Sequence, residues 1–321
     1  MSVMRYLFLT AVSLAAPLLH AAETFPSRPI RLIIPSGAGG ITDILGRNIV
    51  PKLSDALGQQ VVIDNRPGAS GIVGSQIVAK SAPDGYTLLM VFPSHVVNPS
   101  LFPDMPYDTL TAFTPITMVS AVSPVLIVGS QFPARSLAEF IALAKAKPGQ
   151  FNHGSTGAGS MGSLGADLFG AMAGIKFTQV IYKGAPQALT ALMSGEIEFY
   201  LVGSVSTAVT QVKAGRVRAL GVGAKQRNAS LPDVPPIADT LPGYEARGWN
   251  GIFAPAGTPK PIVERLNREL VKIIRSPDMS PALVGEGATA VGNTPAEFDA
   301  IIRLDIAKWS KIIKAVNDRA R

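Results

Sequence analysis

The chain has 321 residues, of which 47% are hydrophobic and 16% are charged, with 31 glycines and 26 prolines. This composition excludes a disordered chain and a coiled coil, and the length predicts about two domains with many turns. Because the sequence has no cysteine, disulfides, thiolate metal sites and a cysteine nucleophile are excluded. The formal net charge is +7, but the basic residues are scattered singly, so no nucleic-acid-binding arm is expected.

Residues 1–22 have the order of a secretory signal peptide. Arg5 precedes an apolar run over residues 6–19, and Ala21 and Ala22 follow it. The apolar run, about 14 residues, is too short to span a bilayer, which needs about 20. We expect cleavage after Ala21 or Ala22 and export of the mature chain to a bacterial periplasm, where disulfides are possible but not required.

Apolar runs and amphipathic stretches alternate in the first part of the mature chain. Residues 30–34 and 61–63 are typical of short strands on either side of a helix over 41–57. A helix near 74–80 leads through a Pro-Asp-Gly turn to a strand over 86–91. This order predicts a parallel sheet flanked by helices.

A second alternating block follows, with a strand over 125–128 and a helix opened by Ser136, which has Glu139 three residues later as in a capping box. Further strands are expected at 151–153, 179–182, 197–202 and 217–222, and further helices near 163–172, 186–193 and 207–214. Beyond a proline-rich stretch, two long helices are expected to begin at Thr258-Pro259 and Thr294-Pro295, with no new strand.

These elements predict an α/β protein of two lobes, each a mainly parallel sheet flanked by helices, joined by a two-strand hinge. Lobe 1 takes residues 23–123 and 226–321, and lobe 2 takes residues 124–225. Ligands of such α/β layers bind beyond the carboxyl ends of strands, so the cleft between the lobes is the expected site.

Each lobe places a glycine-rich loop between a strand and a helix. In lobe 1 the loop contains Ser36, Gly37, Ala38, Gly39 and Gly40. Its main-chain amides and the positive end of the helix suit an anion, although a tight turn explains these glycines equally well. Residues 154–160 repeat the arrangement in lobe 2, and two such loops around one cleft favour binding of a small dianion. For Asp43, in the first helical turn, we expect a structural role.

Two enzyme sites and a metal site fit less well. Gly37, Gly39 and Asp64 imitate a dinucleotide-binding fingerprint, but Thr42 stands where a third glycine or alanine belongs. A hydrolase nucleophile at Ser160 lacks the required preceding glycine.

Only two histidines, His95 and His153, remain in the mature chain as bases or metal ligands. Without clustered carboxylates they offer no metal site, and we expect them to be polar loop residues.

Several motifs occur together in an order typical of one family. They are Pro35 to Gly40 with Asp43 and Arg47, Asn65-Arg66-Pro67-Gly68-Ala69 with Gly71 and Gly74, Pro83-Asp84-Gly85-Tyr86-Thr87, Tyr182-Lys183-Gly184, Lys213-Ala214-Gly215 with Arg218-Ala219-Leu220, Leu231-Pro232-Asp233-Val234-Pro235, and Ala254-Pro255-Ala256-Gly257-Thr258-Pro259. Over the whole mature chain, this order resembles the Bug family, the TctC-like substrate-binding proteins of tripartite tricarboxylate transporters.

The resemblance implies a periplasmic binding fold that closes on a small carboxylate, held mainly by main-chain amides and water, and hands it to membrane permease subunits. By the family pattern the first glycine-rich loop faces the ligand. The other residues implied are Ser94, His95, Ser155, Thr156, Gly159, Ser160 and Tyr182. Two departures, at Ser163 and at residues 201–204 where many relatives carry a histidine and an acidic group, favour a plain carboxylate over an amino acid.

We therefore expect an exported, monomeric solute receptor with no catalytic activity, cofactor, metal or nucleic-acid partner. Two alternatives stay open. The first is a Rossmann-type NAD-dependent oxidoreductase, which the compartment argues against, and the second is a periplasmic sensor or interaction protein.

Overall fold

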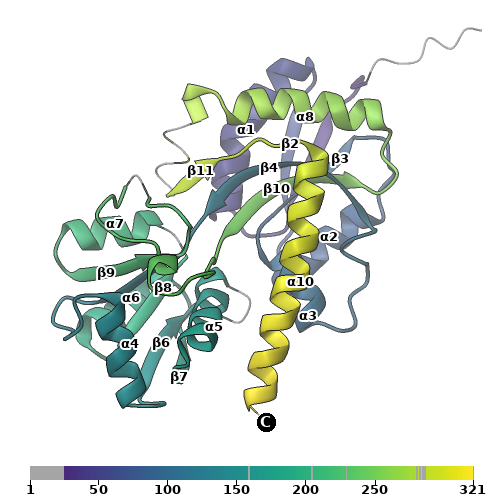
Figure 1. Cartoon of the computed structure of the whole chain (residues 1–321). Helices are drawn as coiled ribbons and strands as arrows, with labels where there is room; N and C mark the ends of the chain where they lie inside the picture. Colours follow the sequence, from purple (N-terminus) through teal and green to yellow (C-terminus); the bar gives the residue numbers. More distant parts are fainter. Residues whose placement is uncertain are drawn as a thin grey trace, which may run out of the picture.

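The computed structural model describes residues 25–157, 160–203, 205–228, 230–279, 281, 283 and 287–320. Two sheets form the centres of two lobes, and the long C-terminal helix runs along one side of the molecule (Figure 1). The expected two-lobed α/β fold is thus confirmed. The expected signal peptide lies outside the described residues. Among the described residues, no helix is both long enough and apolar enough to cross a membrane.

The sheet of lobe 1 has the strand order β11-β4-β10-β3-β1-β2. The strands are β1 (Ile30–Ile34), β2 (Val61–Asn65), β3 (Thr87–Val91), β4 (Phe113–Val122), β10 (Gly248–Pro255) and β11 (Ala288–Ala290). The pairs of β1 with β2 and β3 are parallel, whereas β10 runs antiparallel to β3 and β4, and β11 runs antiparallel to β4.

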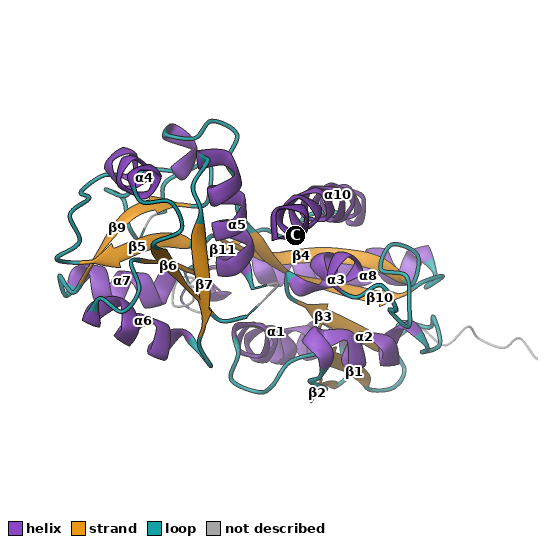
Figure 2. Ribbon diagram, turned by 90° about the horizontal axis from the view of Figure 1, so that it is seen from below, coloured by secondary structure: helices purple, strands orange, loops and turns teal. Residues whose placement is uncertain are grey.

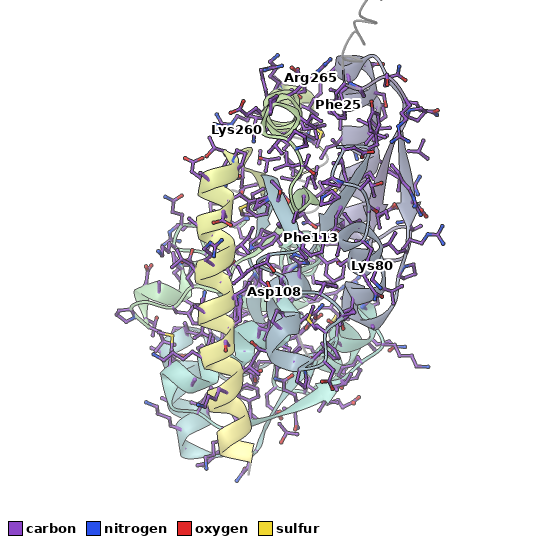
Figure 3. All side chains as sticks on the ribbon, turned by 90° about the vertical axis from the view of Figure 1, so that its right-hand side faces the viewer. Phe25, Lys80, Asp108, Phe113, Lys260 and Arg265 are labelled. Carbon is purple, nitrogen blue, oxygen red and sulfur yellow. The ribbon has the colours of Figure 1, made fainter. Side chains whose placement is uncertain are left out.

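Helices cover both faces of this sheet because successive residues of its strands point to opposite sides. Ile30, Leu32 and Ile34 pack with apolar residues of α1 (Ile41–Leu57) and α8 (Lys260–Ile274). Ile33 belongs to the opposite face, which is covered by α2 (Ile72–Ala79), α3 (Ser94–Leu101) and α10 (Pro295–Ala320). Figure 3 shows α10, in yellow, along one side of the molecule, and Phe113 of β4 lies in the interior.

The sheet of lobe 2 has the order β7-β6-β8-β5-β9, and Figure 2 shows helices above and below it. The strands are β5 (Val125–Gly129), β6 (Phe151–Ser155), β7 (Phe177–Ile181), β8 (Phe199–Val202) and β9 (Val217–Val222). One face carries α4 (Leu137–Ala146) and α5 (Met161–Ala173), and the other carries α6 (Ala185–Ser194) and α7 (Val205–Lys213). Short 3-10 turns lie at Ala69–Gly71, Ile237–Asp239 and Pro277–Met279.

Most strands of each sheet run in one direction, as expected, but both sheets are mixed. In lobe 1, β10 and β11 run against the other strands, and in lobe 2, β5 runs antiparallel to β8 and β9. The expectation of no strand after the proline-rich stretch is wrong. β10 lies there, and it is the central strand that joins the parallel part of the lobe 1 sheet to β4.

The two lobes are connected where β4 ends and β5 begins, and again just before β10. The crossing segments are joined by main-chain hydrogen bonds of Gly223, whose N–H donates to the Pro124 carbonyl (2.8 Å) and whose carbonyl accepts from Ala246 (3.0 Å). In the segment before β10, the Tyr244 hydroxyl donates to the Gly165 carbonyl of α5 (2.9 Å). The lobe limits expected from the sequence remain a prediction, and these contacts lead us to propose that residues 226–246 belong with lobe 2.

Candidate functional site

A cavity of about 320 Å³ lies between the lobes, where the sequence places the expected cleft. Its described lining residues come from the loop after β1, the segment after β3, the ends of β4 and β8, the start of α5, and β10. They are Ser36, Gly40, Ile41, Thr42, Phe92, Pro93, Val122, Met161, Gly203 and Asn250. Met161 and Gly203 belong to lobe 2, so both lobes contribute to the cavity.

The start of α1 forms one wall of this cavity. The first amide N–H groups of a helix have no acceptor within the helix, and they carry the positive end of its dipole. Here the residue before α1 is Gly40, which has extended backbone (φ −76°, ψ 164°) and no side chain to cap those amides. Ser36 adds a hydroxyl oxygen that is buried without a hydrogen-bond partner among the described residues. This wall therefore supplies donors without acceptors, as an anion site requires.

Asp43 gives the loop its shape. Its carboxylate is buried and accepts hydrogen bonds from the Gly39 amide (2.9 Å), from Nε of Arg47 (2.8 Å) and from Nδ2 of Asn65 (3.1 Å). Asn65 also donates to the Ser36 carbonyl (3.2 Å). The hydrogen bond from Arg47 is the largest of the effects that hold the pKa of Asp43 below its usual value. The amide of Gly39 is thus occupied, and Arg47 balances a carboxylate that would otherwise repel an anion.

The inner wall of the cavity holds a buried chain of hydrogen bonds. The Thr42 hydroxyl donates to Oδ1 of Asn250 (2.7 Å), and Nδ2 of Asn250 donates to Oγ of Ser120 (3.2 Å). All three residues are at most 1% exposed. These bonds fix Asn250 between α1 and β4, and they engage the polar side-chain atoms of Thr42 and Asn250.

Lobe 2 contributes the start of α5. Oγ of Ser160 caps this helix by accepting from the Ser163 amide (3.2 Å). The first turn packs tightly on β8, because a Cβ atom on Gly162 would lie 2.2 Å from the Leu201 carbonyl oxygen. This contact places Met161 and the end of β8 at the cavity.

The structure brings only part of the expected ligand-facing set to the cavity. Ser36 and Gly40 line it, and Gly37, Ala38 and Gly39 form the exposed remainder of the same loop. Gly159 lies outside the described residues.

The expected residues of lobe 2 lie around the loop that follows β6. The Ser155 hydroxyl is buried and accepts from the Gly157 amide (3.1 Å), whereas Thr156 is exposed. The Tyr182 hydroxyl donates to Glu196 (2.9 Å), and Ser160 caps α5.

Ser94 and His95 lie at the start of α3 but do not line the cavity. The Ser94 hydroxyl donates to the Ser70 carbonyl (2.8 Å). The ring of His95 is buried between Phe113 and Phe253, with centroid distances of 5.1 Å to each, and burial lowers its pKa to about 3.

His153 is also buried, since it lies within β6 and its Nε2 accepts from the Leu201 amide (3.2 Å). Burial lowers the pKa of His153 to about 3 as well. The expectation of polar loop residues is therefore wrong for both histidines, which are neutral members of the core.

The enzyme alternatives find no support in these positions. Asp64, which would hold a ribose in a dinucleotide site, is paired with Arg31 and Arg66. His153 lies in the core and Ser160 serves as a helix cap, so they do not form a nucleophile and base. Among the described residues, no group of three or more histidine or carboxylate side chains could hold a metal ion.

Sequence reasoning missed most of the lobe 1 lining. Phe92 and Pro93 follow β3 directly, so the rule that ligands bind beyond the carboxyl ends of strands could have found them. Asn250 gives a second signal, since it is a polar residue inside an otherwise apolar strand and needs a buried partner.

The chain is similar to known proteins over most of its length. The profile of the family described as "Tripartite tricarboxylate transporter family receptor" matches residues 45–318. BugT of Bordetella pertussis is 34% identical over 311 residues, which cover 96% of this chain and 94% of BugT.

Two solved structures with ligands are also similar. Rpa4515 of R. palustris with adipate has a TM-score of 0.77 and 34% identity, covering 90% of this chain and 97% of that chain. MatC (Rpa3494) from Rhodopseudomonas palustris with bound malate has a TM-score of 0.75 and 30% identity, covering 90% of this chain and 100% of that one.

Proposed function

Because the chain belongs to the tripartite tricarboxylate transporter receptor family, we propose that it binds a small carboxylate between its lobes and delivers it to the membrane subunits of such a transporter. The observation that carries this proposal is the uncapped start of α1 at the cavity, next to the unpartnered hydroxyl of Ser36. Similar chains solved with adipate and malate support the choice of a carboxylate.

In this proposal the carboxylate accepts hydrogen bonds from Ser36 and from main-chain amides of Gly40 and the first turn of α1. The described residues of the lobe 2 loop, Ser155 to Gly157 and Ser160, approach when the lobes close about the two crossing segments. Ser94, His95 and Tyr182, which do not line the cavity, have no direct role in this binding mode.

The protein acts without catalysis or cofactor, as a monomer exported to the periplasm. The signal-peptide pattern of residues 1–22 and the periplasmic relatives support this location. The membrane permease subunits are the partners that the family description supports.

A thermal unfolding screen tests the binding proposal. The protein is unfolded and refolded to remove bound ligand, and is then heated with mono-, di- and tricarboxylates, amino acids and NAD. An acid at 100 times its Kd should stabilise the fold by about 2.7 kcal/mol. Stabilisation by NAD alone, or by no carboxylate, would refute the proposal.

Two matched valine variants locate the site. Gly40 and Gly184 both precede a helix in extended backbone, but only Gly40 lines the cavity. We expect Gly40→Val to weaken binding by about two to four powers of ten, through loss of two hydrogen bonds to a charged group. Gly184→Val should bind like wild type. Gly39 is a poorer probe, because its φ of +85° would strain valine.

A further inference from the structure

The free hydrogen-bond donors of the inter-lobe cavity come from one segment, the loop before α1 and the start of that helix. Ser36 and the start of α1 provide the free donors, whereas Thr42 and Asn250 are already bonded to one another. The rest of the described lining is made by the side chains of Ile41, Phe92, Pro93, Val122 and Met161, with Gly203. No charged side chain is among these described lining residues.

This separation of free donors from apolar side chains restricts the class of ligand further than the need for a carboxylate does. A hydroxyl group buried against apolar side chains loses its hydrogen bonds to water and gains none in return, which disfavours binding. A hydrocarbon segment at the same place gains about fourfold in affinity for each methylene group buried. The cavity of about 320 Å³ is large enough to hold such a segment beside the carboxylate.

We propose that the ligand is a carboxylic acid with an unhydroxylated hydrocarbon body, whose carboxylate binds at the start of α1 and whose body lies against Phe92, Val122 and Met161. This inference rests on the proposed receptor function and narrows its substrate class. It excludes hydroxylated acids such as sugar acids and compact hydroxy-dicarboxylates as the preferred ligands.

Two pairs of acids test this directly, since the members of each pair share chain length and charge. Adipate is compared with galactarate, its tetrahydroxy counterpart, and hexanoate with gluconate, by isothermal titration calorimetry on refolded protein. We expect the hydrocarbon member of at least one pair to bind at least 100-fold more tightly than its hydroxylated counterpart. Within the series from butyrate to octanoate, affinity should rise with each added methylene until the cavity is full.

Two methionines of α5 provide a matched pair of variants. Met161 lines the cavity and is 8% exposed, whereas Met172 lies near the other end of the helix and is 38% exposed. Met161→Gln should reduce the preference for the hydrocarbon acid at least tenfold, and Met172→Gln should leave it unchanged. Val122→Thr, which keeps the volume of the side chain, is a second test if Met161→Gln fails to fold by circular dichroism.

The outcomes distinguish failure of this inference from failure of the proposed receptor function. If the hydroxylated acid binds as tightly as its hydrocarbon counterpart in both pairs, or if neither Met161→Gln nor Val122→Thr alters the preference, the inference is wrong while the receptor function stands. If no carboxylate of any kind binds, both fail.

Discussion

Replacing Asp43 by alanine tests whether this carboxylate holds the binding loop in shape. The change removes acceptors for the Gly39 amide, for Nδ2 of Asn65 and for Nε of Arg47. Arg47 is 57% exposed, so its ion pair contributes less than about 1 kcal/mol. The other two bonds reach a carboxylate that is 2% exposed in the first turn of α1, where a negative charge is also favourable. We expect the free energy of unfolding to fall by about 2–4 kcal/mol.

Urea unfolding followed by far-ultraviolet circular dichroism measures this loss, with Asp55→Ala, an exposed position of the same helix, as the matched control. The pKa of Asp43 is lowered in the folded state, so its contribution is complete above the ordinary aspartate pKa, about 3.9, and is lost as pH falls through the folded value. The difference between wild type and Asp43→Ala should therefore shrink below about pH 4. An Asp43→Ala variant as stable as Asp55→Ala at pH 7 would refute this account of the loop.

Three further predictions concern other parts of the chain. Burial raises the pKa of Asp167 to about 6. Between about pH 4 and pH 6, wild type should therefore lose stability relative to Asp167→Asn as pH rises, by at most about 3 kcal/mol. Urea titrations of the two proteins would contradict this if the difference between their unfolding free energies stayed constant over that pH range. Gly162→Ala should lower the free energy of unfolding by about 2–3 kcal/mol, because its Cβ would meet the Leu201 carbonyl. Gly203→Ala is the control, since a Cβ there meets nothing within 4 Å. Equal unfolding midpoints of the two variants would count against the packing of α5 on β8. N-terminal sequencing of periplasmic protein should find a chain that begins at Ala22 or one residue later, and an intact Met1 would contradict the signal peptide.

The sequence predicted the parallel parts of both lobes well because their strands are short apolar runs with clear helix boundaries. β1, α1 and β9 occupy the residue ranges expected for them. The strands that were missed break those patterns for physical reasons. β4 contains Pro115, which is tolerated because it lies beside a bulge in the pairing with β10. β10 contains Gly251, and glycine weakens the strand pattern of the sequence. Glycine is required there because a Cβ atom would lie 2.2 Å from the ring of Phe298.

The candidate site was predictable only where local sequence determines it. The loop around Ser36 and Gly40 could be found because a glycine-rich segment between a strand and a helix places its amides at the cleft. The wall formed by Asn250 depends on pairing between distant strands, which local patterns do not report. His95 shows the opposite error, since a polar residue after a strand was expected to face the ligand but turns into the aromatic core.

The central claim is that the start of α1 binds a carboxylate inside the inter-lobe cavity. A crystal structure of the complex with the acid that binds most tightly in the thermal screen tests it most directly. We predict a carboxylate oxygen within about 3 Å of Ser36 Oγ or of a main-chain nitrogen between Gly40 and Thr42. A carboxylate held instead by a lysine or arginine side chain, or an acid bound outside this cavity, would contradict the claim.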